Sequence, residues 1–304
     1  MAHYIFEKAK LKNLSENPFK LENEIKKLVE DNISLLFDLQ FVRSEFQLND
    51  LRIDTLAYDI QSSSFVIIEY KQDKRFSVID QGFAYLSLML NNKAEFVLEY
   101  NKQTRSQLQK EDIDWTQSRI IFISQSFTSY QKQAINFKDL PIELWEIKRY
   151  EDNSISLNQL ISPTSSESIK TISKAGTVAE KVSREVKKYT EDDHTANIPD
   201  DVAELYNKFR DMVLNIADDI IIRPRKWYIG FVAKTNFTDV EIQKSKIKIF
   251  LNVKSGKLED SKGIARDVSK IGHWGNGDYE ISISDDKNLE YIISLVKQAY
   301  LKNR

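Results

Sequence analysis

The chain has 304 residues, of which 41% are hydrophobic and 30% are charged, and its formal net charge is −2. This length and composition predict a folded protein of two ordinary domains and exclude a disordered chain. The net charge argues neither for nor against nucleic-acid binding. Cysteine is absent and only three histidines occur, which excludes disulfides, thiol nucleophiles and zinc–thiolate sites and argues against a histidine-based zinc site.

The first domain is expected over residues 1–155, with helices and strands interleaved along the chain. Apolar residues at helical spacing predict a helix over 20–37, and two β-rich runs joined by the polar turn 61–64 predict a hairpin of strands over 51–59 and 65–71. Further patterns predict helices over 78–92 and 128–137 and strands over 94–100, 119–124 and 142–151. This order indicates an α/β fold, a mixed sheet covered by helices.

Residues 156–198 change in composition. They are rich in Ser, Thr, Lys and Glu, which predicts a linker with a helix near 176–189. A small α+β domain is expected over 199–304. The patterns place its helices over 202–217 and 288–303 and its strands over 220–233 and 244–254.

Two carboxylates and a lysine end the strands of the predicted hairpin. Asp54 lies in one apolar run, and Glu69 and Lys71 close the next, where strand periodicity puts both on one face. Mg²⁺ prefers oxygen ligands and keeps several waters, so one or two carboxylates suffice to bind it. These residues therefore predict a site for a divalent cation and a phosphodiester. The alternative is an ordinary surface pair of Glu69 and Lys71 at a strand end.

The flanking helices supply further candidates. Gln81 and Tyr85 are four residues apart on the predicted helix over 78–92 and so share a face, although Tyr85 can equally be a core residue. Glu22 and Glu24 lie near the start of the first helix and are either ligands or surface acids. We expect Asp59 and Asp73, which are close to the site in sequence, to face solvent.

These motifs resemble, in their order, the PD-(D/E)XK or restriction-endonuclease-like nuclease superfamily. The resemblance covers about 20–150 and falls on Asp54, Glu69 with Lys71, Gln81 with Tyr85, and Glu22 (or Glu24). Ile53 stands where that superfamily often has proline. The resemblance implies a restriction-endonuclease-like mixed sheet flanked by helices. It also implies that Asp54 and Glu69 bind Mg²⁺ or Mn²⁺ and that Lys71 orients or activates the attacking water. Gln81 would contact a DNA phosphate or the ligand shell of the metal, and Glu22 or Glu24 would contribute a further metal ligand.

The second domain offers basic residues beside aromatic ones. Alternation over 244–254 puts Lys244, Lys246 and Lys248 on one strand face, and Arg223 and Arg225 precede the aromatic pair at 227–228. Such a surface suits a nucleic-acid backbone, and it equally suits a solvated strand face.

A glycine-rich segment over 271–280 displays His273 and Trp274. It is either a ligand-recognition loop or a tight turn. Residues 200–304 resemble a family of uncharacterised domains attached to nuclease-like domains, and that resemblance implies no activity.

The favoured function is a metal-dependent DNA endonuclease in restriction, defence or DNA processing. Its expected partners are DNA, a second copy in a homodimer, and a protein bound through the C-terminal domain. One alternative is a catalytically inactive nucleic-acid-binding or scaffold protein with a nuclease fold, and another is a small-molecule-binding protein that uses the glycine-rich segment. The N-terminus lacks a signal-peptide core and no run reaches membrane-spanning length, so a cytoplasmic protein without a membrane segment is expected.

Overall fold

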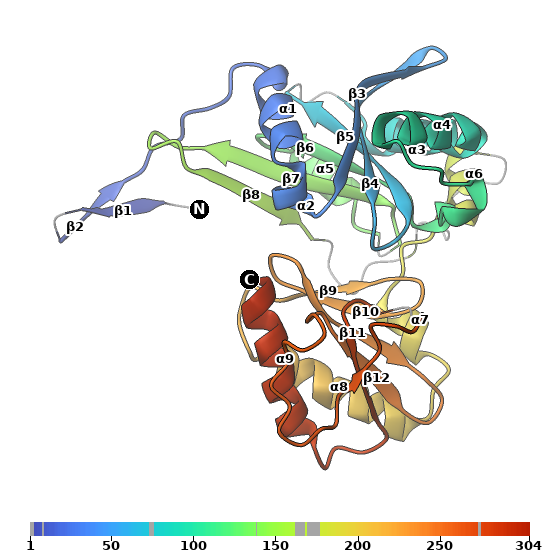
Figure 1. The fold of residues 1–304 in the computed structure, drawn as a ribbon. Coiled ribbons are helices and arrows are strands. Elements are labelled where there is room, and N and C mark those ends of the chain that lie inside the picture. The colour runs from blue at the N-terminus through green and yellow to red at the C-terminus, as the bar shows by residue number, and fades with distance from the viewer. Residues whose placement is uncertain are drawn as a thin grey trace. The chain divides into compact units, whose positions relative to one another are not determined.

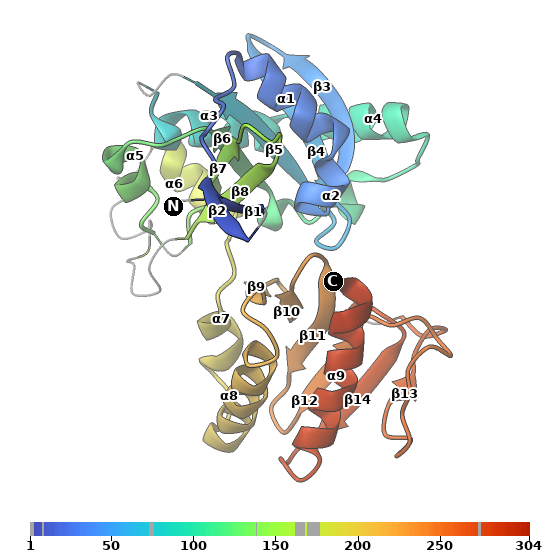
Figure 2. The same ribbon diagram turned by 90° about the vertical axis from the view of Figure 1, so that its left-hand side faces the viewer.

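The computed structural model describes residues 3–7, 9–72, 76–137, 139–161, 168, 177–272 and 275–304. The chain divides into two compact units, Met1–Lys188 (unit 1) and Tyr189–Arg304 (unit 2), each considered by itself (Figure 1 and Figure 2). None of the helices in the described ranges is long and apolar enough to cross a membrane.

Unit 1 is built on a six-stranded mixed sheet in the order β3-β4-β5-β6-β7-β8. Its strands are β3 (Gln40–Leu48), β4 (Leu51–Asp59), β5 (Ser64–Lys71), β6 (Arg119–Ser124), β7 (Ile142–Arg149) and β8 (Ile155–Leu160). The central strands β5, β6 and β7 run parallel, whereas β3, β4 and β8 pair antiparallel with their neighbours. The carboxyl ends of β5, β6 and β7 therefore meet at one edge of the sheet.

Helices cover both faces of this sheet (Figure 1). The helices are α1 (Glu22–Asp31) and α2 (Ile33–Phe37) on one face, and α3 (Val78–Asn91), α4 (Lys93–Thr104) and α6 (Val178–Glu185) on the other. Short helices η1 (Lys110–Asp112), η2 (Trp115–Gln117) and α5 (Ser129–Ala134) lie in connections. Strand β5 is buried up to its last residue because both of its faces are covered, which explains its continuous apolar run. The predicted mixed α/β architecture is confirmed.

The predicted strand over 94–100 is wrong, because these residues belong to α4. Phe96, Val97 and Tyr100 are its buried residues, and their spacing is that of a helix face. The Asn92 N–H donates to Met89 O at 3.2 Å, which ends α3 and leads directly into α4. A short apolar run does not by itself distinguish a buried strand from a helix, and here the tertiary packing decided.

Three further elements differ from the sequence-based expectation in the first half of the chain. The helix over 20–37 divides at Asn32 into α1 and α2, and the polar strand β3 was not predicted. Strands β1 (Tyr4–Glu7) and β2 (Lys10–Asn13) form a separate antiparallel hairpin. Their residues are mostly exposed, so they carry no burial pattern that would predict strands.

The predicted linker over 156–198 also differs from the structure. Its first residues form the edge strand β8, which pairs with β7, and α6 packs against α3 in unit 1. Helix α7 (Glu191–Thr195) already belongs to unit 2. An edge strand has one neighbour and stays partly exposed, so its polar composition is indistinguishable from that of a loop.

Unit 2 contains a six-stranded antiparallel sheet in the order β13-β14-β12-β11-β10-β9. Its strands are β9 (Ile221–Pro224), β10 (Ile229–Val232), β11 (Asn236–Ile242), β12 (Ile247–Leu251), β13 (Arg266–Asp267) and β14 (Tyr279–Ile283). Helices α8 (Asp200–Leu214) and α9 (Leu289–Asn303) share one hydrophobic core with this sheet, as expected for a small α+β unit.

Two strands predicted in unit 2 are shorter than expected. The run over 220–233 divides into β9 and β10, because the Arg225 N–H donates to Tyr228 O at 2.8 Å and turns the chain. The strand expected over 244–254 begins only at Ile247, since Gln243 and Lys246 close a turn with an N–H···O bond of 2.9 Å. The alternation of lysines continues into this turn, so the alternation pattern alone predicts a strand that is longer than β12.

Candidate active site

Asp54 and Glu69 meet where β4 and β5 separate. The ladder between the two strands ends at the Thr55–Ile68 pair. One residue further along, the Asp54 N–H donates to Glu69 Oε1 at 3.0 Å and the Tyr70 N–H donates to Asp54 Oδ2 at 3.1 Å. The two carboxylates thus take the place of backbone acceptors and are held in the opening between the strands.

Lys71 completes this pair of carboxylates. Its Nζ lies 3.1 Å from Glu69 Oε2, so the two side chains share the face that strand periodicity assigns to them. The Lys71 side chain is 18% exposed and the Glu69 side chain only 1%. The Phe76 ring covers the ammonium group at 5.9 Å from its centroid. The site is therefore an acid pair of a buried Glu69 and a half-buried Asp54, with the Lys71 ammonium group at its solvent side.

Burial and the neighbouring Asp54 charge raise the pKa of Glu69 to about 7, and Lys71 opposes this rise without cancelling it. The negative charges of the half-buried Asp54 and the buried Glu69 repel each other, and the burial of Glu69 strengthens this repulsion. A divalent cation with oxygen ligands would relieve both the repulsion and the lost hydration.

Helix α3 brings Tyr85 to the same region and carries Gln81 one turn earlier. Tyr85 is 7% exposed and its hydroxyl donates to Arg52 O at 3.0 Å. Burial, together with the charges of Glu69 and Asp54, raises the pKa of Tyr85, so Tyr85 lies near the acid pair and also packs in the core.

Gln81, one turn earlier on α3, has a buried Oε1 atom for which the described residues supply no hydrogen-bond donor. A buried oxygen without a donor is costly, and a hydrated cation would satisfy it. The carboxylate oxygens of Asp54 and Glu69 therefore fit a cation of the Mg²⁺ type.

The two acids considered on the first helix have different surroundings. Glu22 accepts a hydrogen bond from the N–H of Gln72, which directly follows Lys71. Glu24 instead lies 3.3 Å from Arg149 on β7 and accepts the Lys20 N–H at 3.2 Å. Within the ranges that the structure describes, no three His, Asp or Glu residues gather as a metal cluster. The structure thus places Asp54 next to Glu69 and places Glu22 at the carboxyl end of β5.

A polar group on the other side of the hairpin was not singled out in the sequence. Thr55 Oγ1 donates to Glu30 Oε1 at 2.5 Å and lies 3.1 Å from the Tyr70 hydroxyl. Thr55 and Tyr70 are buried and directly follow the two site acids. In the sequence, Thr55 and Tyr70 could have been identified because they directly follow Asp54 and Glu69. Glu30 could have been identified because it lies eight residues after Glu22 on the same helix.

The basic residues proposed for unit 2 do not line one strand face. Lys244 is exposed in the turn before β12, and Lys246 precedes that strand. Only Lys248 belongs to β12, where it lies 3.6 Å from Glu280. Arg223 is on β9, and Arg225 lies in the following turn, with its carbonyl oxygen 2.7 Å from His194 Nε2.

The glycine-rich segment packs tightly against its sheet. The Asn276 N–H donates to Asp239 Oδ2 at 2.6 Å, and burial raises the pKa of Asp239 to about 6. A Cβ at Gly275 would lie 2.3 Å from the Phe250 ring, and Gly277 has a φ of +87°. Glycines are therefore required here for close packing. His273 and Trp274 lie outside the described residues.

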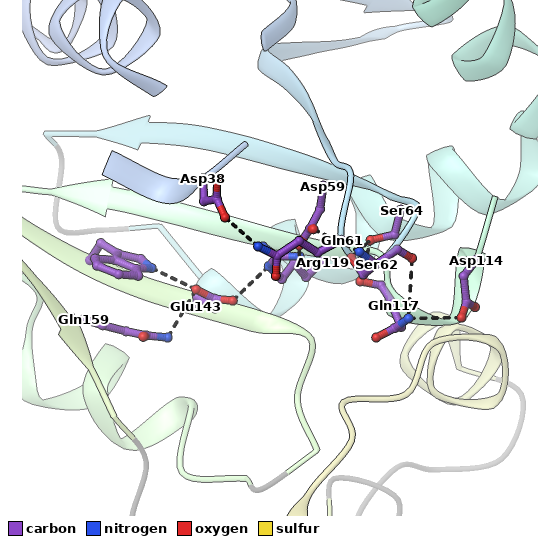
Figure 3. A network of polar contacts seen from close by, with 11 residues as sticks. Asp38, Asp59, Gln61, Ser62, Ser64, Asp114, Gln117, Arg119, Glu143 and Gln159 are labelled. Atoms are coloured by element: carbon purple, nitrogen blue, oxygen red, sulfur yellow. Dashed lines mark hydrogen bonds and ion pairs between the residues drawn. The ribbon is translucent and has the colours of Figure 1, made fainter. Parts of the chain in front are cut away.

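A buried ion-pair network lies at the opposite end of the unit 1 sheet (Figure 3). Arg119 at the start of β6 lies 2.9 Å from Asp59 Oδ2 and 3.0 Å from Glu143 Oε1. Asp59 is 2% exposed, so the expectation that it faces solvent is wrong. The reason is a contact across 60 residues that the local sequence does not contain. Asp73 lies outside the described residues.

Comparison with known proteins gives relatives without an assigned activity. A domain of unknown function (DUF5655) matches residues 191–303. An uncharacterized protein of Haemophilus influenzae is 46% identical over 299 residues, covering 98% of this chain and 99% of that protein.

Three solved structures show weaker similarity to the chain. An EndoMS–double-stranded DNA complex is 15% identical with a TM-score of 0.27, and the match covers 43% of this chain and 49% of EndoMS. A repair endonuclease from Pyrococcus abyssi is 17% identical with a TM-score of 0.22, covering 39% and 44% of the two chains. SfsA from Pyrococcus furiosus, solved with Ca²⁺, is 9% identical with a TM-score of 0.24, covering 49% and 75%. The match thus spans less than half of either endonuclease chain, and similarity at this level assigns no function.

Proposed function

This chain belongs to the same protein family as the Haemophilus influenzae protein, and we propose that its unit 1 is a divalent-cation-dependent nuclease acting on DNA. The observation that carries the proposal is the arrangement of Asp54, Glu69 and Lys71. Two carboxylates occupy an opening between strands, and an ammonium group lies 3.1 Å from one of them. Phosphodiester hydrolysis requires these groups, since negative charge must be neutralised while a water attacks.

Asp54 and Glu69 would hold Mg²⁺ or Mn²⁺ through carboxylate oxygens, and Gln81 Oε1 would accept a hydrogen bond from a water of its hydration shell. When bound, the cation supplies neutralisation of the phosphate charge and a more acidic water. The backbone N–H groups of Asp54 and Tyr70 each fix one carboxylate oxygen, which limits the motion of the ligands. Glu22, bonded to the chain after Lys71, holds the strand end and can accept hydrogen bonds from hydrating waters.

Lys71 serves the reacting groups directly. Its ammonium is close to Glu69 and nearer to solvent, so it can orient the attacking water or stabilise charge developing on the phosphate. Tyr85 keeps its proton because its pKa is raised, and its hydroxyl holds the Arg52 carbonyl on β4. Tyr85 therefore positions the strand that carries Asp54.

Cleavage assays on plasmid, single-stranded and branched DNA test this function. We expect cutting with Mg²⁺ or Mn²⁺, none in EDTA, and none by Asp54→Ala. Asp50→Ala is the matched control, because Asp50 is an exposed acid in the preceding turn. Cutting in EDTA, or undiminished cutting by Asp54→Ala, would contradict the proposal. DNA binding by the wild type without cutting would instead favour a nucleic-acid-binding protein.

The affinity for Mn²⁺ is expected to rise as the pH increases through about 7, the raised pKa of Glu69. Below this pH the Glu69 carboxyl keeps its proton, and a cation must displace it, so affinity falls by up to about tenfold per pH unit. Calorimetric titration of the protein with Mn²⁺ on both sides of this pH measures the effect. Glu69→Gln should bind Mn²⁺ more weakly, and because glutamine does not titrate, the affinity that remains should lack the pH-dependent step. An equally steep dependence in that variant would assign the step to another group.

A further inference from the structure

The β1–β2 hairpin, called the arm below, carries exposed side chains that the proposed hydrolysis does not use. We propose that the arm is a DNA-contacting ribbon that binds the duplex presented to the acid pair. This inference rests on the proposed function and adds a substrate contact to it.

The arm has one largely apolar face and one face that carries its two described lysines. Its register pairs Phe6 with Leu11 and Ile5 with Lys12, so alternate pairs lie on opposite faces. Tyr4, Phe6 and Leu11 are 57%, 71% and 69% exposed. Lys10 and Lys12 are exposed on the other face, where Lys10 is paired in register with the exposed Glu7 and Lys12 with Ile5.

The base of the arm is tied to the rest of unit 1. The His3 ring lies 4.5 Å from the Tyr150 ring, and the Glu151 N–H donates to Ser15 O at 3.1 Å. Within the arm, the Leu14 N–H donates to His3 O at 2.8 Å and closes the hairpin. Beyond this base the strands pair mainly with each other, and the arm projects from the rest of unit 1 (Figure 1). A two-stranded hairpin is marginally stable alone, so a bound partner would order it.

The arm starts from the edge of the sheet that carries Glu69 and Lys71. The segment after it runs along the carboxyl ends of three parallel strands. Asn17 bonds to Arg149 at the end of β7, and Phe19 bonds to Gln125 after β6. Gln72, after β5, donates to Lys20 O at 2.9 Å. Strands about 4.8 Å apart place β7 roughly 10 Å from β5. A major groove is about 12 Å wide, which is comparable with this separation, so a duplex over Lys71 would extend to the end of β7, next to which the base of the arm lies.

The chemistry of the arm fits DNA better than a protein surface. A two-stranded β-ribbon fits the major groove, lysines neutralise phosphates, and aromatic or apolar side chains contact bases. Lys10 and Lys12 complement a polyanion that the acid pair also needs as its substrate. A purely apolar docking contact would use Tyr4, Phe6 and Leu11 and leave both lysines without a role.

Fluorescence anisotropy of a labelled duplex with the full chain in EDTA tests the arm without cutting. We expect Lys10→Ala/Lys12→Ala to weaken binding at least about fivefold and to reduce the salt slope of log K by about 2, one unit for each lost phosphate contact. Phe6→Ala should weaken binding with an unchanged slope. The charge-matched control is Lys102→Ala/Lys110→Ala, exposed lysines on α4 and η1.

Each contrary outcome has a distinct meaning. A wild type that binds no duplex overturns this inference, whereas the proposed nuclease is decided separately by the cutting assays with Mg²⁺ or Mn²⁺. Strong wild-type binding with equal affinities and slopes in both double variants overturns the arm alone. If Phe6→Ala/Leu11→Ala converts a dimer to a monomer in sedimentation and leaves DNA affinity intact, the arm binds a second copy and not DNA.

Discussion

Glu69→Gln is expected to reduce DNA cutting at least about 100-fold while stabilising the cation-free protein above pH 7. Glutamine keeps the shape of the side chain but lacks the charge that holds a cation. It also removes a buried negative charge that faces Asp54. A loss of function with a gain of stability is the mark of a site built for a ligand and not for folding.

The sign of the stability effect follows from the raised pKa of Glu69, which moves from 4.5 to about 7 on folding. Between these values the folded state keeps a proton that the unfolded state has lost, so wild-type stability falls as the pH rises through this range. Above it, the charged carboxylate is buried at full cost. Glu69→Gln does not titrate, so its melting temperature in EDTA should lack this fall.

Thermal unfolding in EDTA on both sides of pH 7, combined with the plasmid assay, measures both parts of this prediction. Lys71→Ala should also lose cutting with its fold intact, because its Nζ is the ammonium group nearest the acid pair. Asp50→Ala should change neither property. Wild-type cutting by folded Glu69→Gln or Lys71→Ala would remove that residue from the mechanism.

Arg119→Met is expected to lower the free energy of unfolding of unit 1 by about 3–5 kcal/mol. Arg119 is the partner of both Asp59 and Glu143, at 2.9 Å and 3.0 Å (Figure 3). Asp59 is 2% exposed, so removing the guanidinium leaves a buried carboxylate without its countercharge, although the Ser62 N–H still donates to Asp59 Oδ1 at 3.1 Å. The network joins β4, β6 and β7, which lie apart in sequence, so its loss should loosen the sheet at the end away from Glu69.

Urea unfolding followed by tryptophan fluorescence and far-UV circular dichroism measures this loss. Arg43→Met is the matched control, because Arg43 pairs with Glu99 at 3.6 Å with a side chain 47% exposed, and such pairs contribute at most about 1 kcal/mol. The double variant Arg119→Met/Asp59→Asn should recover part of the loss, since it removes the stranded charge. A change below about 1 kcal/mol in Arg119→Met would mean that water already compensates Asp59.

Local sequence was sufficient for the centre of the candidate site. Asp54 and Glu69 belong to one hairpin whose short turn sets the register, and strand alternation puts Lys71 beside Glu69. The spacing of Gln81 and Tyr85 placed both on one helix face in the same way. A short chain segment with a fixed period leaves few arrangements, so these proximities follow from the sequence.

Contacts between distant segments were decided by the tertiary structure alone. The packing of α1 beside β5 and β7 placed Glu22 at Gln72 and turned Glu24 to Arg149. Asp59 is buried where Arg119, 60 residues away in sequence, supplies its countercharge. The residues of α4 form a helix whose buried face packs in the core, and the residues of β8 form a strand because they pair with β7. Local periodicity determines which residues share a face, but packing against another element determines whether that face is a site, a core or a surface.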